Sequence, residues 1–181
     1  MTAKSKIRIA TTSLAGCFGC HMSFLDMDER LVALLEQVEL NRSPFTDIKQ
    51  CGPCDIGLIE GGVCNAENVH VLRDFRAHCT ILIAVGACAI NGGVPAMRNY
   101  FDLQDCLQEV YLNGTGVTNP QIPSDIELPL LLDKVCPVSE VVPIDYFLPG
   151  CPPSADEFLQ ILEPLLTGHK PELPKSHVHY D

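Results

Sequence analysis

The sequence has few basic residues and little charge of either sign. Of its 181 residues, 12 are lysine or arginine and 23 are aspartate or glutamate, which gives a formal net charge of −11, and charged residues make up only 19% of the chain. Nucleic acids and anionic membrane surfaces attract clustered basic side chains, so the sequence argues against both as partners. Because a freestanding monomer usually carries more charge on its surface, we expect a permanent protein partner to cover the apolar excess.

The sequence also lacks a long hydrophobic run. Its N-terminus, MTAKSKIRIATT, has no apolar segment of about 7 to 15 residues of the kind that secretory signals contain. No apolar stretch approaches the roughly 18 residues that a membrane-spanning helix needs, so we expect a cytoplasmic protein without a membrane anchor. Cytoplasmic thiols stay reduced, and the ten cysteines therefore favour metal binding or redox chemistry over disulfides.

Strand-like and helix-like segments alternate along the chain. Short apolar runs rich in β-branched residues predict buried strands; they lie at 7–12, 56–60, 80–85 and 141–148. Helical patterns lie at 22–40, 65–79 and 153–168. This alternation predicts an α/β fold, a flavodoxin-like doubly wound parallel sheet with helices on both faces.

The chain length suits one domain. Asn65, with Glu67 in the first turn, is expected to cap the second helix, and Pro153-Ser154 to begin the third. We expect residues 1–168 to form one domain, with an irregular excursion at about 112–140 that is rich in proline and glycine. Residues 169–181 are expected to form a C-terminal tail.

Four cysteines follow predicted strands. Cys17 and Cys20 form a Cys-x-x-Cys after the first strand, Cys88 follows the third in VGACAINGG, and Cys151 follows the last in LPGCPP. The carboxyl ends of parallel strands meet at one edge of a sheet, so we expect the four thiols to converge there. Four thiolates around one point are the ligands of an iron-sulfur cubane.

Residues beside these cysteines are candidates for tuning the cluster. Gly16, Gly19 and Gly150 flank the cysteines and would let the backbone approach and donate N–H groups to sulfur. His21 directly follows Cys20. It is read either as a hydrogen-bonding residue near the cluster or as a polar surface or interface residue.

The remaining single cysteines leave alternatives open. Cys79, Cys106 and Cys136 lie in helix or loop patterns and are interpreted as small hydrophobic residues. Cys64 also follows a strand, in EGGVC. Spacing alone therefore leaves Cys64 open as a ligand.

A second pair of cysteines has two further interpretations. Cys51-Gly-Pro-Cys54 could form a four-cysteine zinc site with Cys17 and Cys20, although the gap between the pairs is longer than in a zinc ribbon. CGPC is also a thioredoxin-type motif, but here it precedes a strand instead of following one. We interpret Cys51 and Cys54 as loop cysteines.

The predicted fold allows a flavin as well. Doubly wound sheets of this kind can bind FMN at the switch point of the sheet. The loop TTSLAGCFGC offers hydroxyls to the phosphate of FMN. Its two thiols, and a cluster bound to them, would compete with the flavin for the same position. A stand-alone flavodoxin-like module that binds zinc or FMN is therefore the alternative to a cluster-bearing subunit.

Four stretches resemble the small subunit of [NiFe] hydrogenases. They are LAGCFGCHMSFLD, LIEGGVCNAEN, VGACAINGGVPAMRN and FLPGCPPSAD, which together run from residue 14 to residue 156. In its short length the chain resembles the soluble NAD-reducing (bidirectional) type. The small cluster-bearing subunit of NADH:quinone oxidoreductase is similar in fold but has two adjacent cysteines at the first motif, so Cys17-Phe18-Gly19-Cys20 sides with the hydrogenases.

The resemblance implies that Cys17, Cys20, Cys88 and Cys151 ligate one [4Fe-4S] cluster, the proximal one, and that Cys64 does not. It implies a large subunit that carries the nickel-iron centre, and a diaphorase module whose iron-sulfur and flavin subunits contain FMN and use NAD. FMN is not expected in this chain, and neither is a catalytic residue. The chain would relay electrons within a hydrogen:NAD+ oxidoreductase.

The resemblance also concerns Glu60, which matches an acidic position near the cluster and the subunit interface. Taken alone, Glu60 is read equally well as a carboxylate that caps a loop. Larger hydrogenase small subunits have a twin-arginine leader and a C-terminal domain with two more clusters, and this chain departs from both. We therefore expect onward electron transfer through another polypeptide. A quinone-oxidoreductase-type cluster subunit is a further alternative.

Overall fold

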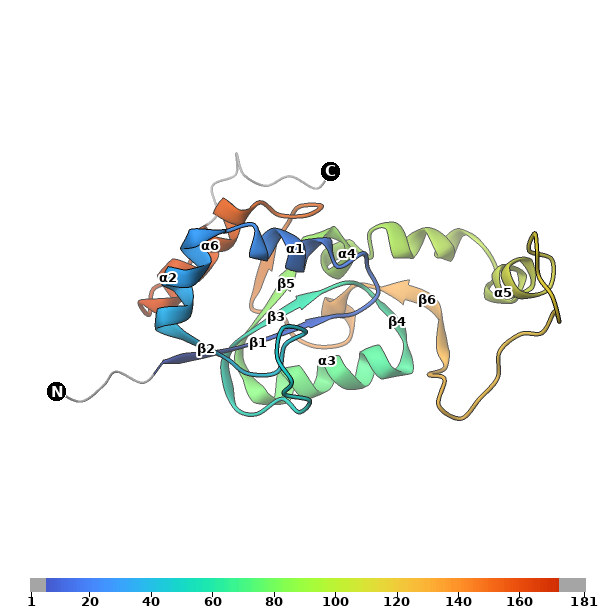
Figure 1. Cartoon of the computed structure of the whole chain (residues 1–181), viewed down its shortest axis with the longest axis horizontal. Coiled ribbons are helices and arrows are strands. Elements are labelled where there is room, and N and C mark those ends of the chain that lie inside the picture. The colour runs from blue at the N-terminus through green and yellow to red at the C-terminus, as the bar shows by residue number, and fades with distance from the viewer. Residues whose placement is uncertain (1–5, 173–181) are drawn as a thin grey trace.

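The computed structural model describes residues 6–172, and its centre is a five-stranded sheet (Figure 1). The strands are β1 (Ile7–Ser13), β2 (Val38–Leu40), β3 (Cys54–Glu60), β5 (Cys79–Val85) and β7 (Tyr146–Leu148). They lie in the order β2-β1-β3-β5-β7, and every neighbouring pair is parallel. Numbered within the sheet this is 2-1-3-4-5, the order of flavodoxin-type doubly wound folds. The predicted fold class is confirmed.

Helices cover both faces of the sheet (Figure 1). One face is covered by α1 (Gly19–Leu25), α2 (Glu29–Gln37) and α6 (Ala155–Leu166). The rings of Phe24 and Phe158 meet edge to face in that layer, 5.5 Å apart. The other face is covered by α3 (Ala66–His78), and the short α4 (Gly86–Asn91) follows β5.

Residues 94–136 form an extension that reaches away from the sheet (Figure 1). It begins with the 3-10 helix η1 (Val94–Tyr100) and α5 (Leu103–Tyr111). It returns through an irregular stretch to β6 (Leu131–Cys136), which pairs antiparallel with β4 (Val63–Asn65) and is followed by the 3-10 turn η2 (Val138–Glu140). The excursion predicted at 112–140 is irregular up to residue 130, and β6 and η2 form most of the remainder. Much of the predicted tail at 169–181 lies outside the described residues.

Two element predictions are wrong in their bounds. The helical pattern at 22–40 contains two helices and strand β2, because α1 ends at Leu25 and Asp28, with φ +51°, caps the start of α2. The strand predicted at 141–148 covers only β7. The segment before it is a turn that contains Pro143, which has no backbone N–H for a sheet ladder.

Both predicted helix caps are confirmed. The Asn65 side chain accepts a hydrogen bond from the Asn68 backbone nitrogen at 2.8 Å. Ser154 and Glu157 form a reciprocal capping box at the start of α6. Within residues 6–172, none of the helices combines the length and the apolar character needed to cross a membrane.

Candidate metal centre

The loops at the carboxyl edge of the sheet carry the four cysteines at the ends of the predicted strands. Cys17 and Cys20 follow β1, and Cys20 lies in the first turn of α1. Cys88 lies in α4 after β5, and Cys151 follows β7. Because β1, β5 and β7 belong to one parallel sheet, all four residues emerge at the same edge.

The four thiols lie close enough to influence one another's charge. Burial is the main cause that raises the pKa of the Cys20 thiol, and charge on Glu60 and on the three other cysteines raises it further. Burial also raises the pKa of Cys88, and Cys151 and Cys17 act in the same direction. Cys17 and Cys151 are exposed, whereas Cys20 and Cys88 are partly buried. The structure thus brings together the four cysteines that the sequence singled out.

Two glycines that the sequence reasoning missed make room for these thiols. Gly86 has φ +80°, and a Cβ on it would collide with the sulfur of Cys20. Gly93 has φ +49°, and its Cβ would lie 2.8 Å from the sulfur of Cys88. Both lie in the stretch VGACAINGG, whose glycines were the available signal. An alanine at either position would be strained and would displace a thiol.

The glycines that the sequence did single out lie beside the same loops. A Cβ on Gly19 would lie 3.1 Å from the sulfur of Cys17, whereas one on Gly16 would only touch the backbone of Gly61. The carbonyl of Gly150 accepts a hydrogen bond from the backbone of Ala87 at 2.8 Å. Donation of their N–H groups to sulfur stays a prediction.

A backbone donor to sulfur that the sequence reasoning did not identify comes from Val94. Its N–H group hydrogen-bonds to the Cys88 thiol and opposes the rise in the pKa of Cys88. Val94 begins η1, so the extension and the cysteine loops are in direct contact.

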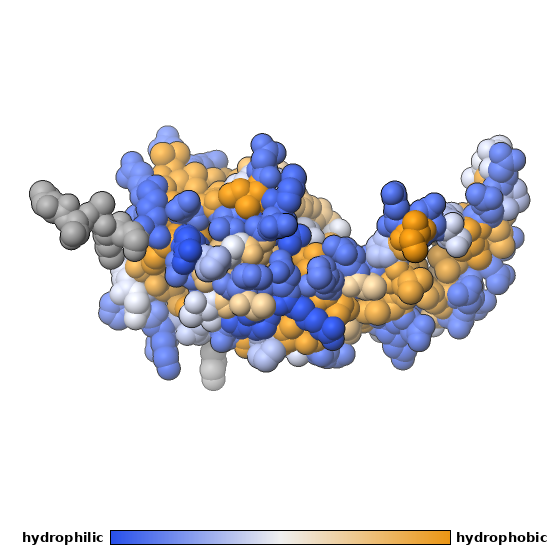
Figure 2. Space-filling model, turned by 90° about the horizontal axis from the view of Figure 1, so that it is seen from below, coloured by the Kyte–Doolittle hydropathy of each residue, from blue (hydrophilic) through white to orange (hydrophobic). Residues whose placement is uncertain are grey.

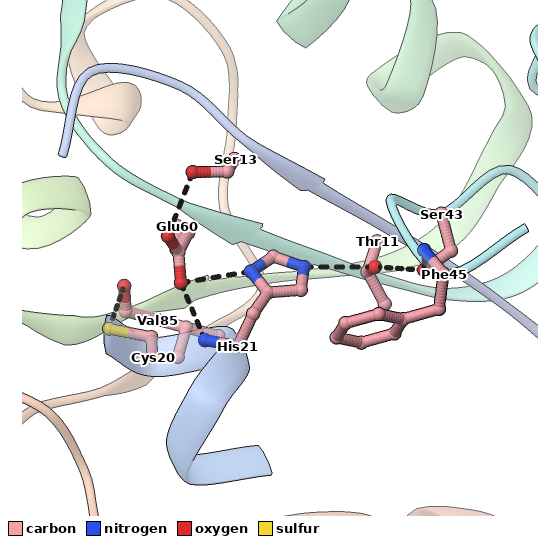
Figure 3. A network of polar contacts seen from close by, with 8 residues as sticks. All are labelled: Thr11, Ser13, Cys20, His21, Ser43, Phe45, Glu60 and Val85. Carbon is pink, nitrogen blue, oxygen red and sulfur yellow. Dashed lines mark hydrogen bonds and ion pairs between the residues drawn. The ribbon is translucent and has the colours of Figure 1, made fainter. Parts of the chain in front are cut away.

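Glu60 is a buried carboxylate between Ser13 of β1 and His21 in the first turn of α1 (Figure 3). It is 3% exposed, and its Oε2 accepts a hydrogen bond from the backbone nitrogen of His21 at 2.7 Å and lies 2.9 Å from His21 Nδ1. Its Oε1 accepts from Ser13 Oγ at 2.8 Å. Burial alone would raise the pKa of Glu60, but the contacts with His21 and Ser13 outweigh it and lower the pKa.

The network continues from His21 into the sheet. His21 Nε2 lies 3.0 Å from Thr11 Oγ1, which in turn lies 2.8 Å from Ser43 Oγ (Figure 3). His21 also stacks on the Phe18 ring at 4.7 Å. The surface interpretation of His21 is wrong, because the residue is 5% exposed, and the hydrogen-bonding interpretation agrees with its contacts.

The Cys64 thiol has a hydrogen-bond partner of its own. The residue is in β4, and its thiol donates a hydrogen bond to Asn68 Oδ1 at 3.3 Å. Cys106 lies in α5 and Cys136 at the end of β6, both partly buried. Cys136 is therefore a strand residue, and so is Cys79, which begins β5; the helix or loop interpretation is wrong for both.

Three other cysteines gather at the opposite, amino edge of the sheet. The sulfur atoms of Cys51, Cys54 and Cys79, which we call the three-cysteine group, all lie within 4.8 Å of one another and could hold a metal ion. The loop interpretation is wrong for Cys54, which begins β3. A zinc site shared with Cys17 and Cys20 is excluded, because the length of β3, about 20 Å at 3.3 Å per residue, separates the two edges.

A family model described as the NADH ubiquinone oxidoreductase 20 kDa subunit matches residues 17–165. The NAD-reducing hydrogenase HoxS subunit delta of Cupriavidus necator is 51% identical, over 98% of this chain and 87% of that protein. One subunit of the F420-non-reducing hydrogenase vhu of Methanococcus voltae is 37% identical over 96% of this chain, which spans only 61% of that protein.

Solved structures agree with these relatives. A crystal structure of an NAD+-reducing [NiFe]-hydrogenase in the H2-reduced state contains a chain that is 56% identical with a TM-score of 0.96, and the match covers 98% of this chain and 100% of that one. A chain of the Dm. baculatum [NiFeSe]-hydrogenase matches with a TM-score of 0.60 at 18% identity, covering 97% of this chain and 70% of that one, and shares the fold. The family match and the four cysteines at the carboxyl edge together indicate an iron-sulfur protein. This chain belongs to the family of the NADH ubiquinone oxidoreductase 20 kDa subunit.

Proposed function

We propose that this chain is the small subunit of a cytoplasmic NAD-reducing [NiFe] hydrogenase, in which it relays electrons. The observation that carries the proposal is the 56% identity and the TM-score of 0.96 to a chain of an NAD+-reducing [NiFe]-hydrogenase, over the full length of that chain. The location agrees with the cysteines, all ten of which are free thiols. Free thiols are typical of a reducing compartment.

In this proposal Cys17, Cys20, Cys88 and Cys151 hold one [4Fe-4S] cluster. The donor set fits, because four thiols from three loops share one neighbourhood and cubane clusters are held by four cysteine thiolates. The room beside Cys20 and Cys88, where a Cβ on Gly86 or Gly93 would collide with sulfur, supports the same assignment. Such a cluster, when bound, takes up and releases single electrons.

The chain's other residues position these ligands and set their surroundings. Glu60 fixes the first turn of α1 through the backbone nitrogen of His21, and thereby the direction in which Cys20 points. Gly16, Gly19 and Gly150 lie next to the cysteine ligands in the sequence, where the lack of a side chain lets the backbone approach the cluster. Hydrogen bonds, net charge and exposure around a cluster set its reduction potential, so these are tuning positions and not catalytic ones.

The partners in this proposal are a large subunit that carries the nickel-iron centre and a diaphorase module that contains FMN and uses NAD. The exposed thiols of Cys17 and Cys151 lie at the edge that the large subunit would cover. Apolar surface also continues from the body of the molecule onto the extension (Figure 2). There Val94, Met97 and Tyr100 are 69%, 60% and 85% exposed, and such apolar surface usually marks an interface.

The test compares Cys88→Ser with Cys106→Ser in the assembled complex. Cys88→Ser is expected to abolish the reduction of NAD+ by hydrogen. It is expected to retain the reduction of a dye by NADH, because that reaction would need only the diaphorase module. Cys106→Ser is expected to retain both activities. Hydrogen-driven NAD+ reduction at wild-type rates in Cys88→Ser would refute the assignment.

A quinone-oxidoreductase-type cluster subunit is the second candidate, because the matching family model carries that description. The Cys-x-x-Cys of Cys17 and Cys20 favours the hydrogenase type. Purification of the native complex separates the two candidates, since only the first predicts nickel in it.

A further inference from the structure

The three-cysteine group is more deeply buried than the cysteines at the carboxyl edge. Cys51, Cys54 and Cys79 are 5%, 3% and 4% exposed. Cys54 and Cys79 are the first residues of β3 and β5 and lie opposite each other in the register of these parallel strands. Cys51 reaches them from the preceding loop. Strand pairing and loop closure thus place three thiols from two distant segments at one buried point.

The spacing of the sulfur atoms is close to the spacing around one metal ion. Zinc binds thiolate sulfur at about 2.3 Å, so sulfurs around one ion lie about 3.8–4.0 Å apart. The three sulfurs here all lie within 4.8 Å of one another. A small inward movement of the side chains would therefore bring all three to the distance that one ion requires.

Hydrogen bonds already join the three thiols into one group. The Cys51 thiol interacts with the thiols of both Cys54 and Cys79. A disulfide would use two of the three sulfurs and leave the third as a buried thiol beside it. A single ion, in contrast, uses all three. Soft thiolate ligands select Zn²⁺ and Cu⁺ among the common metal ions.

Charged side chains of both signs surround the group. Burial is the main influence on all three thiols and raises their pKa, that of Cys54 to about 12. One arginine opposes this rise at each thiol; these are Arg42 at Cys51, Arg8 at Cys54 and Arg76 at Cys79. The carboxylates Asp74 at Cys51 and Asp55 at Cys54 act in the opposite direction to the arginines. Metal binding requires the thiolate form and releases the thiol protons, so the ion itself has to displace them.

The surroundings seal the group from solvent. All three cysteines belong to the apolar cluster that includes Leu72 and Phe75 of α3, both fully buried. Thiol–disulfide exchange needs access for an attacking thiol, and burial denies it. An ion bound during folding needs no such access once the site has closed.

We propose that Cys51, Cys54 and Cys79 bind a single thiophilic metal ion, Zn²⁺ or Cu⁺, in a structural site at the amino edge of the sheet. The ion ties the loop before β3 to the start of β5. The site is independent of the proposed cluster, from which the length of β3 separates it. It accounts for the CGPC motif, which the proposed electron relay does not use.

The test measures zinc, copper and iron per complex after anaerobic purification without chelators or metal-affinity resin. The wild type and the control Cys106→Ser are expected to contain about one more zinc or copper per chain than Cys79→Ser. Whichever element is lost identifies the ion. Iron content is expected to be the same in all three proteins, which separates a failure here from a failure of the proposed cluster.

Cys51→Ser is the second variant, because Cys51 lies in a loop and its replacement leaves the β3–β5 pairing intact. It is expected to lose the same ion. Equal zinc and copper in the wild type and in Cys51→Ser would overturn the proposal, and so would an intact mass that reveals a Cys51–Cys54 disulfide in the wild type. The wild-type mass remains decisive even if a variant fails to fold.

Discussion

The carboxylate of Glu60, at the end of β3, contacts His21 at two points: Oε2 lies 2.7 Å from the backbone nitrogen and 2.9 Å from Nδ1 of the ring. His21 directly follows Cys20 in α1. One buried side chain of the sheet therefore fixes the helix turn that presents a proposed cluster ligand.

Replacing Glu60 by glutamine should destabilise the chain. The amide cannot accept from His21 and Ser13 as a carboxylate does, and a poorly satisfied buried polar group costs about 1–3 kcal/mol. The control Glu163→Gln, on the exposed side of α6, is expected to change the free energy of unfolding by less than about 0.5 kcal/mol. Urea unfolding measures both, and equal values for the two variants would contradict the role of Glu60.

Gly86→Ala should impair both folding and metal loading. Alanine there is strained by φ +80°, and its Cβ would collide with the sulfur of Cys20. Gly168→Ala is the matched control, since Gly168 has φ +79° with open space around its Cβ position. We expect the control to cost about 1–2 kcal/mol through backbone strain alone. Gly86→Ala should cost more and lower the iron content, and identical behaviour of the two variants would argue against a packed thiol site.

The apolar surface of the extension should be needed for assembly. Tyr100 and Phe101 are 85% and 69% exposed, and the double replacement Tyr100→Asp with Phe101→Asp would bring two charges into a buried interface. We expect the variant to co-purify poorly with its partner subunits. Val32→Asp, on α2 and 65% exposed, is the control and should assemble normally. Normal assembly of the double variant would place the interface elsewhere.

Asp145 should make the stability depend on pH in acid. It accepts hydrogen bonds from Arg76 at 2.7 Å and from the Leu82 backbone at 2.8 Å. Burial alone would raise its pKa, but these contacts outweigh burial and lower the pKa below the ordinary value of 3.8. A lowered pKa in the folded state gives stability that is present above the unfolded pKa and lost as the pH falls through the folded value.

The stability difference between the wild type and Asp145→Asn should therefore be constant above about pH 5 and shrink below about pH 4. Urea midpoints of both chains across this range measure the difference. A difference that grows as the pH falls would contradict the lowered pKa.

The fold and the four-cysteine edge could be predicted from the sequence because they rest on local patterns. Apolar runs mark β1, β3 and β5, and parallel strands that alternate with helices must end at one edge. The bounds of β2 and β7 could not be predicted. Both are three-residue strands, whose pairing depends on tertiary contacts and not on their own residues.

The three-cysteine group could not be predicted for a similar reason. Cys51 and Cys54 are close in sequence, but Cys79 joins them only through the pairing of β3 with β5. Nor did the sequence indicate that Glu60 and His21 would meet, since they are 39 positions apart. Contacts of this kind depend on the register of neighbouring elements, which periodicity does not specify.

The most direct test of the central claim is the iron and acid-labile sulfide content of the anaerobically purified complex, with low-temperature EPR after reduction by dithionite, in the wild type and in Cys88→Ser. We expect the wild type to contain about four more irons and four more sulfides per chain than the variant, and to show one cubane signal that the variant lacks. Equal iron, equal sulfide and identical spectra in a fully assembled variant would contradict the assignment of a cluster to Cys17, Cys20, Cys88 and Cys151.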